Sequence, residues 1–150
     1  MASRAGAEAP TPGLRFRRMT RFVIDAPTLP HVVAERVRVA PHHQLVAPQL
    51  LRSQALALLF DAVRGGELTE AEAMDRHDAL TGVKVRLLGD RVSRRVAWQI
   101  AREHGLASTS DAEYLAVTRL QADAFVTVDP DARERAEGVV PVATVDALTK

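Results

Sequence analysis

The sequences RFVID, residues 21–25, and AFVTVD, residues 124–129, share one pattern. Each is a short apolar run rich in β-branched residues, which is typical of a buried strand, and each ends at an aspartate. The chain between them alternates strand-like and helix-like segments, which favours βαβ units and a mainly parallel sheet. The expected fold is a three-layer α/β/α sandwich, with both aspartates at the carboxyl edge of its sheet, where such folds bind ligands.

The expected elements follow one another along the chain with recognisable stop and start signals. Strands are expected at residues 22–24, 45–47, 83–87, 125–128 and 140–142, and helices at about 28–39, 48–63, from 69 onward, 90–104, 111–120 and 131–136. Gly65 and Gly66 end one helix, and the sequence from Thr69 to Glu72 predicts a capped start for the next. Trp98 is expected in the core because its helix carries apolar residues at helical spacing.

Composition limits the classes of protein to be considered. The chain has 150 residues, of which 47% are hydrophobic, enough for one domain with a real core. No apolar run reaches the roughly 18 residues that span a bilayer, and the first residues lack the apolar segment of a secretory signal. A cytoplasmic location is therefore expected. The absence of cysteine excludes disulfides, zinc–thiolate sites and thiol nucleophiles.

Residues 1–18 differ in composition from the rest of the chain. They are rich in Ala, Pro, Gly and Arg, and four arginines against Glu8 give them a charge of +3, so the rest carries about −2. We expect a poorly ordered tail at 1–18 and a single domain at 19–150, with Met19 as an alternative start to Met1. A domain with this charge has no global basic field for nucleic acid, so local arginines or bound cations must supply any RNA binding.

Three aspartates have ordinary structural explanations when they are taken singly. Asp129 before Pro130 is a helix N-cap, Asp111 three residues after Ser108 completes a capping box, and Asp25 forms a turn. Capping gives no reason for three acids to gather at one sheet edge, where they repel one another. A hard divalent cation such as Mg²⁺ or Mn²⁺ removes that repulsion.

Four stretches in order along the chain resemble the motifs of the PIN domain family, and most closely those of VapC-like bacterial toxins. They are VIDA (residues 23–26), APQLLRSQALALL (47–59), STSDAEYLAV (108–117) and FVTVD (125–129). The resemblance covers residues 19–148. It implies a PIN-like fold and a cytoplasmic, Mg²⁺- or Mn²⁺-dependent endoribonuclease. It also implies an RNA substrate, a homodimer and a small antitoxin protein as partner.

The resemblance assigns residues to the expected site. Asp25, Asp111 and Asp129 match the acidic metal-binding and catalytic positions, Ser108 and Thr127 match supporting hydroxyl residues, and Tyr114 matches an aromatic that packs in the core. The family's remaining acid falls on Gln54, a neutral metal ligand that weakens the expected affinity. Pro27 also departs from the family pattern. Glu113 points to another face of its helix and is not expected to compensate.

The mechanism implied by the resemblance is direct attack of a metal-activated water on an RNA phosphodiester. Arg21 and Arg52 are candidates for phosphate contact only because they lie near the motifs. An alternative is a catalytically weakened or inactive PIN domain that serves as a binding or regulatory module. A phosphotransfer domain with an aspartyl acceptor fits less well, because no acidic pair or suitably placed lysine accompanies Asp25.

Overall fold

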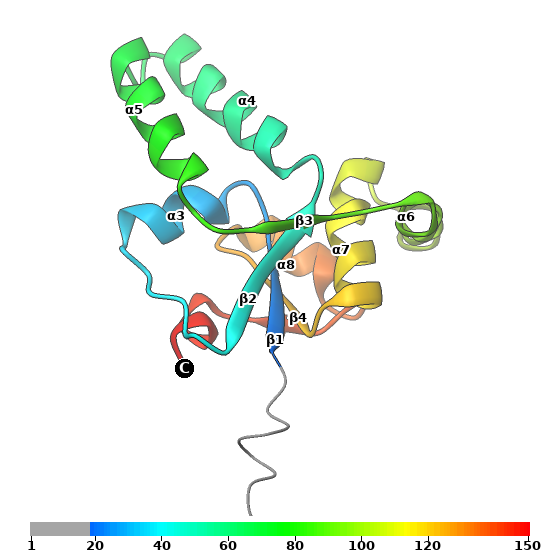
Figure 1. Ribbon diagram of the computed structural model, residues 1–150. Helices are drawn as coiled ribbons and strands as arrows, with labels where there is room; N and C mark the ends of the chain where they lie inside the picture. The colour runs from blue at the N-terminus through cyan, green and yellow to red at the C-terminus, as the bar shows by residue number, and fades with distance from the viewer. Residues whose placement is uncertain (1–18) are drawn as a thin grey trace, which may run out of the picture.

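A five-stranded sheet forms the centre of the computed structural model, which describes residues 19–150 (Figure 1). Its strands are β1 (Thr20–Ile24), β2 (His43–Pro48), β3 (Arg86–Leu88), β4 (Ala124–Val126) and β5 (Val142–Ala143). They lie in the order β3-β2-β1-β4-β5, and every neighbouring pair is parallel. The tail expected at residues 1–18 lies outside the described residues.

Helices cover both faces of this sheet. They are α3 (Thr28–Ala34), α4 (Leu51–Arg64), α5 (Glu70–Thr81), α6 (Arg91–His104), α7 (Thr109–Gln121) and α8 (Pro130–Ala136), with a final 3-10 helix η1 (Val145–Thr149). Helix α7 packs on β1, β2 and β4, α6 packs outside α7, and α3 lies on the other side of the sheet. The α4–α5 pair projects beyond the carboxyl ends of the strands (Figure 1). The expected three-layer α/β/α sandwich is confirmed.

The core lies where the central strands meet α7. Val23, Val46 and Val126, one from each of the three central strands, are completely buried. Strands buried on both faces have continuous apolar sequences, which is why these segments lack the alternation of a half-exposed strand. Burying each such side chain contributes about 1.5–3 kcal/mol. Within residues 19–150, no helix is long and apolar enough to cross a membrane.

Capping residues define the helix boundaries largely as the sequence predicts. Thr69 and Glu72 form the expected capping box at the start of α5. Asp90 and Ser93 form a second capping box, at the start of α6. Gly105 ends α6 in the left-handed conformation, with φ of 63°. These contacts satisfy backbone groups that a helix end leaves without partners.

Several element boundaries differ from the expected ones. Helix α3 ends at Ala34 rather than near residue 39, and Arg36, two residues beyond its end, has a positive φ of 51°. Pro48 is the last residue of β2 and does not open α4. Strand β3 starts only at Arg86, because just three residues pair with β2. Strand β4 ends at Val126, so the two residues after it lead into the site instead of the sheet.

The prediction that Trp98 lies in the core is wrong: its side chain is 65% exposed. The face of α6 that packs on α7 is formed by Ser93, Ala97 and Ile100, which are buried. These residues follow one another at four- and three-residue steps, the helical spacing of a single face. Trp98 lies one residue beyond Ala97, about 100° around the helix, and therefore faces solvent.

Gly105 offers a direct test of how α6 ends. Its φ is positive, and a Cβ there would meet nothing within 4 Å, so Gly105→Ala carries only a conformational cost. We expect a loss of about 1 kcal/mol in the free energy of unfolding, measured by urea denaturation. Gly82→Ala, at the end of α5 with a negative φ of −79°, is the matched control and is expected to be neutral or slightly stabilising. Equal effects of the two substitutions would contradict this account.

Candidate functional site

The candidate site lies where the direction of chain progression through the sheet reverses. From β1 the chain moves outward to β2 and β3, and it then returns to β4 and β5 on the other side of β1. The carboxyl ends of β1 and β4 are therefore adjacent, at the position where open α/β sheets bind ligands. Ile24 lies opposite Val126 in the register, so the next residues, Asp25 and Thr127, meet just beyond the sheet.

Asp25 is the most enclosed acid of the site, with only 5% of its surface exposed. Its Oδ2 accepts a hydrogen bond from the Thr127 hydroxyl at 2.7 Å. Its Oδ1 accepts from the backbone N–H of Thr28 at 3.3 Å and from the Thr28 hydroxyl. Burial raises the pKa of the Asp25 carboxyl above its usual range, and the hydrogen bonds from Thr28 and Thr127 partly oppose this.

Two threonines connect Asp25 to the loop after β4. The Thr28 hydroxyl accepts from the backbone N–H of Val128 at 3.0 Å, and the Thr127 hydroxyl accepts from that of Asp129 at 3.0 Å. Thr127 was expected to support the site. Thr28 was not singled out, although its position three residues after Asp25 is a spacing typical of local capping contacts.

Asp129 caps α8 as its position before Pro130 predicts. Its Oδ1 accepts from the backbone N–H of Asp131 at 3.0 Å, and Pro130 occupies the first turn. This bond uses one oxygen of the Asp129 carboxylate, so the other oxygen can bind a further ligand. Capping and lining of the site are therefore compatible roles for this residue.

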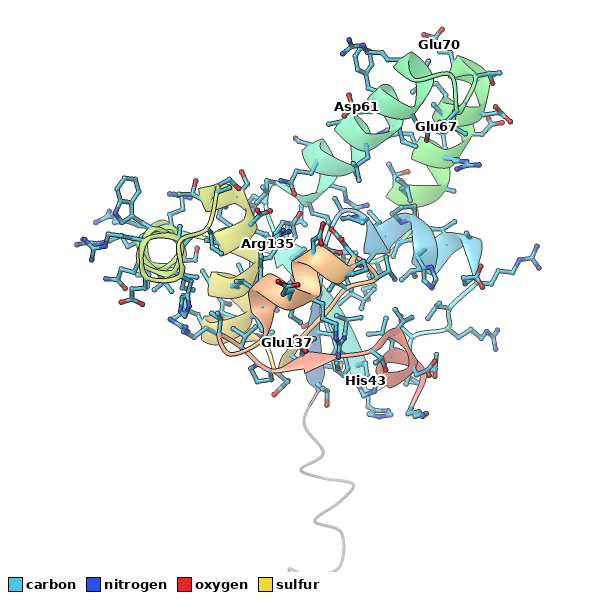
Figure 2. The ribbon with its side chains drawn as sticks, turned by 180° about the vertical axis from the view of Figure 1, so that it is seen from behind. His43, Asp61, Glu67, Glu70, Arg135 and Glu137 are labelled. Carbon is cyan, nitrogen blue, oxygen red and sulfur yellow. The ribbon has the colours of Figure 1, made fainter. Side chains whose placement is uncertain are left out.

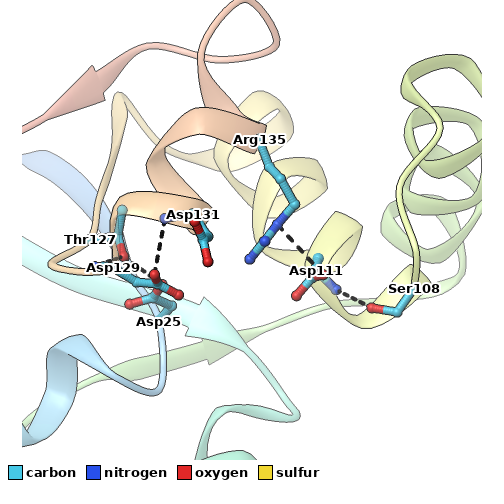
Figure 3. A network of polar contacts seen from close by, with 7 residues as sticks. All are labelled: Asp25, Ser108, Asp111, Thr127, Asp129, Asp131 and Arg135. Atoms are coloured by element: carbon cyan, nitrogen blue, oxygen red, sulfur yellow. Dashed lines mark hydrogen bonds and ion pairs between the residues drawn. The ribbon is translucent and has the colours of Figure 1, made fainter.

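Asp111 shows half of the expected capping box. Ser108 Oγ accepts from the Asp111 backbone N–H at 3.2 Å. The Asp111 carboxylate itself points toward α8, where its Oδ2 lies 3.6 Å from Nε of Arg135 (Figure 3). Both side chains are about one-third exposed, so this ion pair is screened by water and adds little stability.

All three aspartates line one cavity of about 280 Å³, as expected from the strand order and helix starts. Gln54 lines the same cavity, at the position that the resemblance to PIN domains implies. Among the described residues that line it, Arg135 is the only cationic one. With its three carboxylates ionised, the lining carries a charge of −2. Arg135 was not singled out from the sequence, because only the return of α8 across the β4 edge brings it to Asp111.

The donor atoms of the cavity fit a hard divalent ion: they are carboxylate and amide oxygens, and a dication balances the charge. The side chains do not yet converge, because within residues 19–150 no three acidic or histidine side chains are grouped to hold a metal ion. Two of the acids are engaged in other contacts. The Asp25 oxygens are occupied by hydroxyl donors, and Asp111 is turned toward Arg135.

Gln54 lies in the cavity wall with its oxygen already in use. Its Oε1 accepts from the Tyr114 hydroxyl at 2.5 Å. Burial raises the pKa of the Tyr114 hydroxyl, and the nearby acids Asp25 and Glu113 raise it further, so Tyr114 remains a donor. Tyr114 was expected only to pack in the core, and it does so while also orienting Gln54. Glu113 is not among the residues that line the cavity.

The two arginines considered from the sequence have structural roles elsewhere. Arg52 donates to the carbonyls of Leu80 and Val83 at 2.8 and 3.0 Å, which ties α4 to the end of α5. Arg21 donates to the carbonyl of Gln121 at 3.4 Å, near the amino end of β1 and away from the site. Neither lines the cavity.

Comparisons with known proteins inform the fold but not the chemistry. No protein-family model matches the chain, and no curated protein matches it. Among solved structures, the crystal structure of PAE2754 from Pyrobaculum aerophilum is similar, with a TM-score of 0.63 and 22% sequence identity. The match covers 87% of this chain and 94% of that one. At this identity the similarity shows a shared fold.

The buried Asp25 predicts a specific pH dependence of stability. Because its folded-state pKa is raised, the folded protein holds the proton more tightly than the unfolded chain, and it loses stability as the pH rises through that window. Asp25→Asn removes this penalty. We expect the free energy of unfolding of the variant to rise relative to that of the wild type from about pH 4 upward. Urea denaturation in metal-free buffer at a series of pH values measures this difference.

Asp61→Asn, at an exposed position of α4, is the matched control (Figure 2). Parallel stability–pH curves for Asp25→Asn and the wild type would show that burial does not penalise the Asp25 carboxylate.

Proposed function

We propose that this chain is a PIN-like, Mg²⁺- or Mn²⁺-dependent endoribonuclease. The observation that carries the proposal is the cavity at the β1–β4 switch point, where Asp25, Asp111 and Asp129 gather with a single guanidinium. Three carboxylates around one small cavity are costly unless a cation accompanies them. The order and spacing of the sequence motifs, which resemble those of PIN domains, support the same reading.

In this proposal, some residues of the cavity bind the ion and others position the residues that bind it. Asp25, Asp111 and Asp129 would hold the ion, with Gln54 as a neutral additional ligand. When bound, such an ion lowers the pKa of a coordinated water and neutralises charge on a phosphate. Thr28 and Thr127 fix the orientation of the Asp25 carboxylate.

Arg135 adds a positive charge at the edge of the cavity. In the absence of substrate it pairs with Asp111 at 3.6 Å. Guanidinium groups suit phosphate oxygens as well as carboxylates. We propose that Arg135 contacts the RNA phosphate during the reaction, which would free Asp111 for the metal.

Asp111→Asn tests the nuclease proposal. This change removes one negative ligand while the Ser108 cap, which uses the backbone N–H, remains. We expect cleavage of a mixed RNA panel at graded Mn²⁺ and Mg²⁺ to fall about 100-fold or more.

Asp131→Asn is the matched control, because Asp131 lies beside the site on α8 without lining the cavity. Its cleavage rate is expected to stay close to that of the wild type. Metal-dependent cleavage that is equal in wild type and Asp111→Asn would point to a contaminating nuclease.

A second candidate function is a weakened or inactive PIN domain that acts as a binding or regulatory module. The observation that favours it is Gln54, a neutral side chain whose oxygen is already bonded to Tyr114. A glutamate at this position would accept the same hydrogen bond and would add the missing negative charge. The two candidates therefore differ in how much metal affinity the wild type retains.

Gln54→Glu separates these candidates. The added charge is expected to raise Mn²⁺ affinity about tenfold, measured by isothermal titration calorimetry. Gln99→Glu, which adds the same charge on the exposed side of α6, is the matched control. Measurable Mn²⁺ binding by the wild type supports the nuclease. Binding by Gln54→Glu alone supports the inactive module, and no binding by either protein would contradict a metal site.

The wider proposal is a cytoplasmic toxin of a toxin–antitoxin pair that forms a homodimer and is inhibited by a small antitoxin. The resemblance to VapC-like toxins carries this part. The projecting α4–α5 pair supports it with exposed apolar side chains, Leu56, Phe60 and Met74. Such surface is typical of protein–protein contacts.

A further inference from the structure

One exposed face of α6 carries an unusual set of side chains, far from the helix face that packs on α7. Arg91, Arg95, Trp98 and Arg102 follow one another at steps of four, three and four residues, which places them in one row. Arg94 flanks Trp98 one turn earlier. All five are exposed, and Trp98 is 65% exposed. These five residues are called the arginine–tryptophan stripe below, and the row spans about 16 Å of helix.

The four guanidinium groups of the stripe differ in their contacts from other arginines of the domain. Within residues 19–150, none of them forms a hydrogen bond or an ion pair, whereas Arg119, Arg133 and Arg135 all do. The single acid within α6, Glu103, lies about 100° around the helix from Arg102. The stripe therefore presents a concentrated positive charge in a domain whose overall charge is slightly negative.

We propose that the arginine–tryptophan stripe binds single-stranded RNA, with a base stacked on Trp98 and the arginines on neighbouring phosphates. The proposal rests on the proposed nuclease function and deepens it, because it assigns a substrate-holding surface outside the cavity. Exposed aromatic rings stack on unpaired bases, and arginines hold the adjoining backbone. This pairing of contacts needs no global positive field.

The surroundings of Trp98 favour nucleic acid over a protein partner. Protein interfaces use both tryptophan and arginine, but the fully buried core of an interface is apolar and depleted in charge. The neighbours of Trp98 along the stripe, at three, four and seven residues, are all arginines. Four like charges around one ring resist burial in the apolar core of a protein interface, whereas the regularly spaced phosphates of a nucleic acid neutralise them.

The stripe is also connected to the catalytic cavity. Helix α6 leads through residues 105–108 directly into α7, whose first turn carries Asp111. Figure 3 shows this connection, with Ser108 at the junction and α6 beside it. An RNA strand held on α6 is thus bound to the same pair of packed helices that supplies one of the three metal-site carboxylates.

Trp98 is the only tryptophan in the chain, so its fluorescence reports on the stripe alone. We would titrate Asp111→Asn with a ten-nucleotide single-stranded oligoadenylate in EDTA, where neither metal binding nor cleavage occurs. The expected result is strong quenching of Trp98, because the base stacks on the indole. The logarithm of the affinity should fall with that of salt at a slope of about −2 to −3, as for three or four phosphate contacts.

Absence of quenching at low salt would overturn the proposal. A blue shift together with a doubled mass in sedimentation would also overturn it, because Trp98 would then lie in a protein interface. The salt dependence excludes adventitious apolar quenching, which salt does not weaken.

Variants separate the two kinds of contact. Trp98→Ala is expected to weaken binding about tenfold when measured by anisotropy of labelled RNA, and Trp98→Phe should restore most of the loss. Replacing Arg91, Arg95 and Arg102 by Ala should reduce the salt slope by about 2. Arg38→Ala, an exposed arginine outside α6, is the matched control and should reduce it little. An equal effect of Arg38→Ala and Arg95→Ala as single changes would show that the stripe is not special.

The same experiments distinguish the proposal of RNA binding at the stripe from the nuclease proposal. Binding at the stripe without any metal-dependent cleavage by the wild type would refute the nuclease and leave the stripe. Cleavage by the wild type without quenching in Asp111→Asn would refute the stripe and leave the nuclease.

Discussion

The site depends on the burial of one carboxylate between two adjacent strand ends. Asp25 sits where β1 and β4 separate, enclosed by Thr28 and Thr127, and burial raises its pKa. The hydroxyls that satisfy it also bond to the backbone of the following loop, so the same contacts hold the start of α3 and the path toward Asp129. Burial of the ionised acid at this position costs free energy, which the hydrogen bonds from the two threonines offset only in part.

Helix capping and a place in the cavity wall coincide in two acids of this site. Asp129 caps α8 with one oxygen, and Ser108 caps α7 through the backbone of Asp111. The Asp111 carboxylate is therefore not used by the cap, and it faces the cavity beside Arg135. Each cap fixes the start of a helix and thereby the position of an acid. A capping explanation for an aspartate is therefore no argument against a role in binding, because the cap itself positions the side chain.

Local sequence signals predicted the strands, most helix starts and the gathering of three aspartates at one sheet edge, because each depends on burial, capping or strand order. The place of Gln54 beside them was implied only by the resemblance to PIN domains. The sequence did not predict the features that depend on how the helices pack. Trp98 was expected in the core because its neighbours are apolar, yet the packed face of α6 is one residue away. Arg135 reaches Asp111 only through the return of α8, and the bond from Tyr114 to Gln54 joins residues sixty positions apart.

We propose that a divalent ion binds among Asp25, Asp111 and Asp129. The most direct measurement is a crystal structure of the wild-type protein grown with Mn²⁺, with diffraction data collected at the manganese edge. The account predicts an anomalous peak inside the cavity, with Asp111 turned away from Arg135 and toward the ion. Well-ordered carboxylates in the cavity with no anomalous peak there would contradict it.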